Sequence, residues 1–118
     1  MTQTVQYISA QDLRRFIPLA DLTLENLNDL AKKTPIQALS KGRKLFAKGA
    51  SINASFYLLS GEVALTCDKG ETVIAGGTPQ SRFPLDHHNP RLCTATVRAD
   101  AHFIAIDNNL LDILLTWD

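Results

Sequence analysis

Glycines, prolines and arginines gather in one stretch of this sequence, between Gly76 and Ala99. Glycine-rich turns can present backbone N–H groups to an anion, and an arginine can pair with a phosphate through two parallel hydrogen bonds. The stretch offers both, since it opens with two glycines and carries Arg82 and Arg91 further along. Its three prolines each remove a backbone donor, so no long regular strand runs through it. We therefore predict a structured loop that could hold a small anionic ligand.

The histidines of the chain suggest metal or catalytic chemistry only weakly. His87 and His88 are adjacent in the loop, where neighbouring side chains seldom aim at one ion, and the sequence offers no evident third ligand. His102 is alone in its strand segment. We expect no metal, no cofactor and no catalytic residues, and we interpret the chain as a protein that is not an enzyme.

The two cysteines, Cys67 and Cys93, lie far apart in the sequence and form no CxxC pair. They could make one disulfide, or remain two reduced, small, buried residues. We predict the reduced pair, because nothing at the N-terminus is typical of a secretory signal.

Length and charge limit the remaining possibilities. The chain has 118 residues, which is the size of one domain. Its 12 basic and 12 acidic residues balance, which argues against a surface for nucleic acid or for an anionic membrane. No apolar run is long enough to span a bilayer. We predict a cytoplasmic protein.

The elements that would position the loop begin with helices. Ser9 is a suitable N-cap for a first helix, which Pro18 ends. Thr23 is a suitable N-cap for a second helix over residues 24–33, where leucines recur with helical spacing. At the other end of the chain, Asp107 or Asn108 would cap a final helix. That helix is apolar over much of its circumference, so we expect it to be buried on more than one side or to meet a partner chain.

Between the helices the pattern changes to short runs of strand character, each ended by glycine or by the loop. Runs of this size that recur every 8–12 residues or so are typical of a β-sandwich or barrel. The expected strands are residues 36–39, 43–47, 56–60, 62–68 and 71–75, then 94–99 and 101–107 after the loop.

The order of these elements resembles a cyclic-nucleotide-binding domain, of the type found in the bacterial catabolite activator and in protein-kinase regulatory subunits. The resemblance covers about residues 13–115. The residues that carry it are the glycine turns Lys41-Gly42 and Lys48-Gly49, the run Phe56-Tyr57-Leu58-Leu59-Ser60-Gly61-Glu62-Val63, and Ala95-Thr96-Val97-Arg98-Ala99. It implies a mainly β fold with flanking α-helices, an eight-stranded double-stranded β-helix, or jelly roll.

On this resemblance the whole chain, residues 1–118, is a single cyclic-nucleotide-binding-like domain. Residues 1–34 hold the N-terminal helices, and residues 35–107 form the β-roll with a cassette loop at 76–93. Residues 108–118 are the start of a C-terminal helix that we expect to be cut short.

Members of the family hold the cyclic phosphate in a cassette similar to Gly-Asp-x-x-Gly-Glu-x-Ala-Leu, followed by Pro-Arg-x-Ala-Thr-Val. Here Gly77 matches the first glycine, Ser81 replaces the second, and Arg82 replaces the glutamate that accepts from the ribose. The position of the phosphate-binding arginine falls on Cys93, while Arg91 lies two residues early. The candidate ligand-binding residues of this degenerate cassette are Gly77, Ser81, Arg82, Phe83, Arg91, Cys93, Thr94 and Thr96.

Each replacement weakens a known contact with the nucleotide. A serine side chain obstructs a close backbone approach, an arginine cannot accept a hydrogen bond, and an unpaired buried phosphate costs several kcal/mol. We therefore expect no cAMP or cGMP binding of the usual kind, and a regulatory module that acts through interaction or dimerisation. The alternative is a sensor for a cyclic nucleotide or another anion that signals through the C-terminal helix. The expected partners are a second copy or an output domain on that helix, with no nucleic acid and no membrane.

Overall fold

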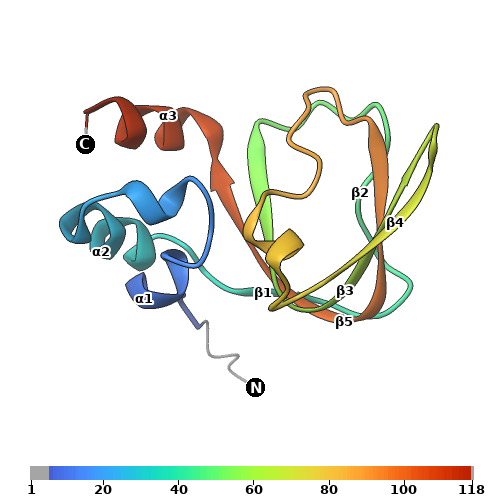
Figure 1. Cartoon of the computed structure of the whole chain (residues 1–118), viewed down its shortest axis with the longest axis horizontal. Helices are drawn as coiled ribbons and strands as arrows, with labels where there is room; N and C mark the ends of the chain where they lie inside the picture. Colours follow the sequence, from blue (N-terminus) through green and yellow to red (C-terminus); the bar gives the residue numbers. More distant parts are fainter. Residues whose placement is uncertain (1–5, 118) are drawn as a thin grey trace, which may run out of the picture.

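The helices lie on one side of the molecule and the strands on the other (Figure 1). This computed structural model describes residues 6–117, so expectations for residues 1–5 and 118 lie outside the described part. The helices are α1 (Ala10–Leu13), α2 (Leu24–Lys32) and α3 (Asn108–Trp117). Two short 3-10 turns, η1 (Leu19–Asp21) and η2 (Pro79–Arg82), complete the helical elements. None of the helices in residues 6–117 combines the length and the apolar character required to cross a membrane.

The helices begin where their capping residues predict. The Ser9 hydroxyl accepts from the backbone N–H of Asp12 at 3.1 Å, and the Thr23 hydroxyl accepts from that of Asn26 at 3.2 Å. The Asp107 carboxylate accepts from the first turn of α3, at 2.7 Å from the nitrogen of Asn109. Each oxygen satisfies a backbone donor that has no partner inside its helix. The three predicted helix starts are confirmed.

The strands form one antiparallel sheet that curls into a roll. They are β1 (Gln37–Leu39), β2 (Lys44–Phe46), β3 (Ala54–Cys67), β4 (Gly70–Ala75) and β5 (Cys93–Asp107). Their order is β1-β5-β3-β4, and β2 pairs with another part of β5. A mainly β roll with flanking helices is the predicted fold class, and it is confirmed.

The two long strands correct the sequence prediction. We expected a break at Gly61 and another near Asp100, but β3 and β5 run through both positions and pair with each other along most of their length. Register shifts in β3 around Gly61 let the paired strands bend instead of ending. Residues 6–117 therefore form five strands and not the eight that the resemblance implied.

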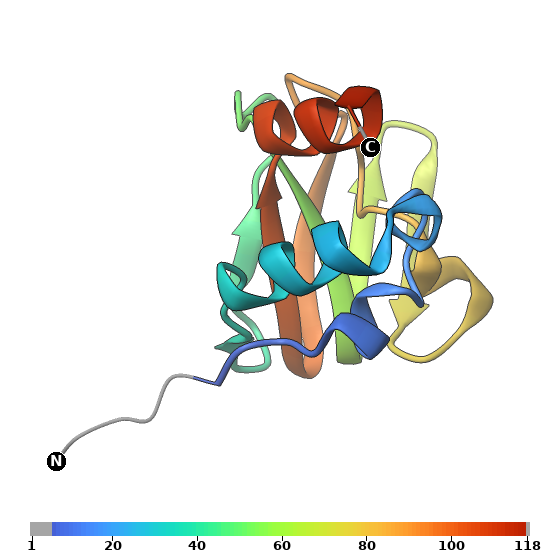
Figure 2. The same cartoon turned by 90° about the vertical axis from the view of Figure 1, so that its left-hand side faces the viewer.

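Two hydrophobic cores lie on either side of the roll wall. The first joins the helices to the end of the roll and includes Phe16, Leu27 and Tyr57. Figure 2 shows α2 and α3 crossing in front of the strands that this core covers. The second core fills the roll itself and includes Phe46, Leu85 and Val97. Leu85 belongs to the cassette loop, so part of that loop is packed into the roll.

The cysteines are the second correction. Cys67 and Cys93 form a disulfide, contrary to the predicted reduced pair. They are direct neighbours across the β3–β5 ladder, with Cα atoms 4.3 Å apart. This distance lies close to the short end of the range that a disulfide spans. The sequence could not show it, because the pairing depends on a strand register that only the fold sets.

Candidate functional site

The cassette loop begins with a close approach of two backbone segments. The Gly76 N–H donates to the Gly61 carbonyl at 2.9 Å. A Cβ atom on Gly76 would lie 2.5 Å from the Cα of Ser60, so only glycine fits there. This contact fixes the loop against β3 and directs the next residues towards the N-terminal helices.

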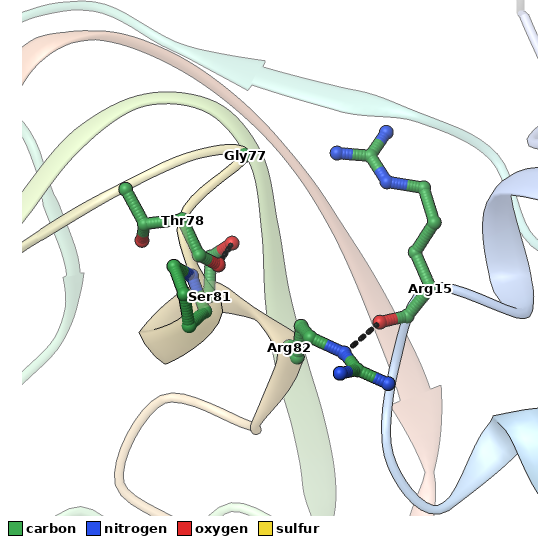
Figure 3. Close-up of a pocket in the computed structure, with 6 residues that line it drawn as sticks. Arg15, Gly77, Thr78, Ser81 and Arg82 are labelled. Carbon is green, nitrogen blue, oxygen red and sulfur yellow. Dashed lines mark hydrogen bonds between the residues drawn. The ribbon is translucent and has the colours of Figure 1, made fainter.

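A cavity of about 380 Å³ lies between this part of the loop and the segment that follows α1 (Figure 3). Three of the predicted site residues, Gly77, Ser81 and Arg82, line it. Arg82 connects its two sides, because its Nε donates to the Arg15 carbonyl at 3.1 Å. The Arg82 carbonyl in turn accepts from the Ile17 N–H at 2.8 Å. The remaining lining residues are Arg15, Thr78 and Pro79.

The cavity carries positive charge. Arg15 and Arg82 both line it, and no lining residue is acidic. The closest carboxylate of Arg15 is that of Asp12, at 3.9 Å from its Nη1, and both side chains are half exposed. The two hydroxyls of the cavity donate to the loop itself, that of Ser81 to the Thr78 carbonyl and that of Thr78 to the Ala75 carbonyl. Figure 3 shows the two guanidinium groups pointing away from each other, so the cavity can attract an anion by its positive charge but the two groups do not converge on one point.

Arg91 lies apart from this cavity and inside the molecule, with 2% of its surface exposed. Its guanidinium donates to three carbonyls, those of Ala54, Asp86 and His88. The same group lies over the rings of Phe46 and Phe56, at 4.8 and 5.5 Å from their centroids. Cation–π contacts of this kind strengthen when the cation is desolvated. The Arg91 side chain is thus engaged by the protein itself.

Asp86 holds the neighbouring part of the loop, with only 2% of its side chain exposed. One carboxylate oxygen accepts from the Cys93 N–H at 2.8 Å, and the other accepts from both the backbone and the ring of His88. Burial alone would raise the pKa of Asp86, but the hydrogen bonds from Cys93 and His88 outweigh it and lower the pKa. Burial lowers the pKa of Arg91, and the charge of Asp86 opposes that shift. The folded loop therefore stabilises the ionised form of Asp86.

The other predicted site residues do not join the cavity. Phe83 is 53% exposed, and Cys93 is held in the disulfide. Thr94 accepts from the Lys48 N–H at 3.0 Å, and Thr96 pairs with β2 and β3 in the sheet. The structure brings Gly77, Ser81 and Arg82 together and places the remaining five elsewhere.

Sequence reasoning missed Arg15 and did not include Asp86 among the candidate site residues. Arg15 follows a short helix far from the loop in sequence, and no local signal points to its place in the cavity. Asp86 carried a weak signal, because aspartate tolerates the left-handed backbone conformation that it adopts here, with φ of 42°. In residues 6–117, no three histidine, cysteine, aspartate or glutamate side chains cluster in a way that could hold a metal ion.

Comparison with known proteins gives matches of structure but none of sequence. No family model matches the chain, and no curated protein matches it. A cyclic nucleotide-binding-like protein from Brucella abortus superimposes with a TM-score of 0.69 and 22% identity, over 92% of this chain and 97% of that one. The sensor domain of the transcriptional regulator DNR from Pseudomonas aeruginosa gives a TM-score of 0.72 and 19% identity, over 91% and 80%.

A third match comes from a protein with a bound nucleotide. The regulatory domain of Toxoplasma gondii PKA, solved with cAMP, gives a TM-score of 0.72 and 16% identity, over 89% of this chain and 42% of that one. This chain has the fold of a cyclic-nucleotide-binding domain. The segment that the sequence resemblance assigned to the cassette loop lies between β4 and β5 in this structure.

Proposed function

We propose that this chain is a non-catalytic regulatory module that does not bind cAMP or cGMP in the usual way and acts by interaction or dimerisation. The position of Arg91 carries the proposal. Among residues 6–117, Arg91 is the arginine nearest in sequence to the position where the resemblance expects the phosphate-binding arginine, and it is buried, donates to three backbone carbonyls and stacks on two aromatic rings. Exposing it to a phosphate would break all of these contacts.

Three further observations support the same proposal. Cys93, at the position that corresponds to the phosphate-binding arginine, is part of the disulfide. Leu85 is 1% exposed and packs in the core of the roll, so loop and core are already in contact there. The matching solved structures include a sensor domain and a regulatory domain, which favours a regulatory role without catalysis. A cytoplasmic location stays a prediction.

Isothermal titration with cAMP and with cGMP tests the absence of nucleotide binding. We expect no heat of binding at nucleotide concentrations up to the millimolar range. Binding with a dissociation constant in the micromolar range, worth about −8 kcal/mol, would contradict the proposal.

The proposed contact surface is the outer side of α3, and the proposed partner is a second copy of this chain. Leu111 and its neighbours pack α3 against the first core, but Ile113 is 55% exposed and Leu115 is 39% exposed. The net charge of the chain is zero, so two copies do not repel each other. Sedimentation should show a dimer that Ile113→Asp dissociates, while Asp112→Asn, also on α3, leaves it intact. A monomer at all concentrations would overturn dimerisation through α3.

A second candidate function is an anion sensor, and the cavity that holds Arg15 and Arg82 favours it. The alternative ligand is a phosphate-bearing molecule that joins the cassette loop to the N-terminal helices. Thermal-shift measurements with nucleotides, cyclic dinucleotides and inorganic phosphate test it. Stabilisation that is lost in Arg82→Ala and kept in Arg14→Ala would support the sensor. No stabilisation by any of these ligands would favour the interaction module.

A further inference from the structure

The disulfide lies beside a second cavity, separate from the one that holds Arg82. This cavity has a volume of about 520 Å³, and both Cys67 and Cys93 line it. Cys67 is partly exposed, whereas Cys93 is 8% exposed. Of the two cysteines, Cys67 is therefore the more exposed residue at this cavity.

The charges around this cavity balance. Lys48 and Lys69 line it together with two acidic residues, Asp68 and Glu71. Lys48 forms an ion pair with Asp68. A small dithiol, neutral or as its thiolate, would therefore meet no net negative charge on its way to the disulfide.

A hydrogen bond connects the disulfide directly to the buried part of the cassette loop. The Cys93 N–H donates to the Asp86 carboxylate at 2.8 Å, and the other oxygen of that carboxylate holds His88. The Asp86 carbonyl accepts from Arg91. Since Cys93 is also the first residue of β5, the disulfide anchors the strand end that these contacts depend on.

We propose that the Cys67–Cys93 disulfide is a redox modification site, which dithiols reduce through this cavity, and that its reduction loosens residues 84–92. A thiolate of the dithiol attacks Sγ of Cys67, the disulfide bond breaks, and Cys93 leaves as a thiolate. The second thiolate of the reagent then attacks its own sulfur in the mixed disulfide and releases Cys67. Overall, the protein gains two electrons and two protons, and the dithiol becomes a cyclic disulfide.

Reduction of the folded protein with dithiothreitol tests the site. Alkylation by iodoacetamide, counted by mass spectrometry, should modify no cysteine before reduction and both cysteines after it, without denaturant. The reduced protein should melt roughly 10 °C lower, because the closed loop of 26 residues no longer restricts the unfolded chain. Hydrogen exchange should accelerate in peptides that cover residues 84–93 and stay unchanged in those of α2.

The double variant Cys67→Ser with Cys93→Ser is the matched control, and dithiothreitol should change neither its melting temperature nor its exchange. Because the reduced wild-type protein is measured directly, the test does not depend on the folding of this variant. Three results would overturn the proposal. They are free thiols in the protein purified without reductant, reduction only in the presence of denaturant, and reduced protein whose exchange is unchanged or accelerated throughout the chain.

Discussion

The guanidinium carbon of Arg91 lies 4.8 Å from the centroid of the Phe46 ring. Phe46 comes from β2 and belongs to the core of the roll, whereas Arg91 comes from the cassette loop two residues before β5. Arg91, a candidate ligand-binding residue, is thus buried and packed against the core of the roll. Its Nε has no hydrogen-bond partner among residues 6–117, so the packing on aromatic rings has to offset part of the cost of burial.

Replacing Arg91 by alanine should destabilise the fold strongly. The change removes part-buried hydrogen bonds to three backbone carbonyls and two ring contacts, and we expect a loss of about 3 kcal/mol in the free energy of unfolding. Urea denaturation measures it. The control is Arg98→Ala, which removes an ion pair between half-exposed side chains of Arg98 and Glu71 and should cost less than about 1 kcal/mol. Equal losses in the two variants would contradict the structural role of Arg91.

Ionised Asp86 should stabilise the folded protein, so the protein should become less stable at low pH. Its pKa is lower in the folded protein than the usual 3.8, so its contribution is complete above that value and is lost as the pH falls through the folded pKa. We expect the melting temperature of the wild type to fall below about pH 4. Asp86→Asn should be less stable at pH 7 and should lose less on acidification. Asp112→Asn, which removes an exposed carboxylate of α3, is the control. Parallel pH profiles of Asp86→Asn and the wild type would refute this assignment.

Gly61 and Gly77 offer a matched comparison, because both have positive φ, 85° and 80°. A Cβ on Gly61 would lie 2.3 Å from the Asp100 carbonyl oxygen, while one on Gly77 would meet nothing within 4 Å. Gly77→Ala should therefore cost only the conformational strain, about 1–2 kcal/mol. Gly61→Ala should cost at least about 3 kcal/mol, since two backbones must also move apart. Thermal denaturation of both variants measures these losses of stability. A smaller loss for Gly61→Ala than for Gly77→Ala would be inconsistent with the bend in β3.

Tyr57 links the roll to the N-terminal helices. Its hydroxyl donates to the Ile17 carbonyl at 3.0 Å, and its ring packs on Phe16. Burial raises the pKa of Tyr57 to about 12. Stability linked to this group is present below pH 10 and declines above it, because only the unfolded chain ionises there. Tyr57→Phe should lose about 1 kcal/mol at pH 7 and should show a smaller decline between pH 10 and 11. Chemical denaturation at these pH values measures both effects.

The sequence predicted the elements that depend on near neighbours. The caps at Ser9, Thr23 and Asp107 each act within three residues, so the helix starts could be predicted from local pattern alone. The order of glycine turns and strands predicted the fold class through its resemblance to a known family, and the matching solved structures confirm that class. The helix caps, by contrast, depend only on backbone preferences that neighbouring residues set.

Tertiary structure decided everything that depends on register and on distant contacts. A bulge at Gly61 joined two predicted strands into one, and the β3–β5 register placed Cys67 opposite Cys93 as a disulfide. The cavity of Arg82 required Arg15, which lies 67 residues away. Arg91 was identified as a candidate site residue from its type, but the packing of Phe46 and Phe56 determined that it is buried. A residue type shows which interactions a side chain can make, and the fold determines which of them form, because only the fold sets its neighbours and its access to water.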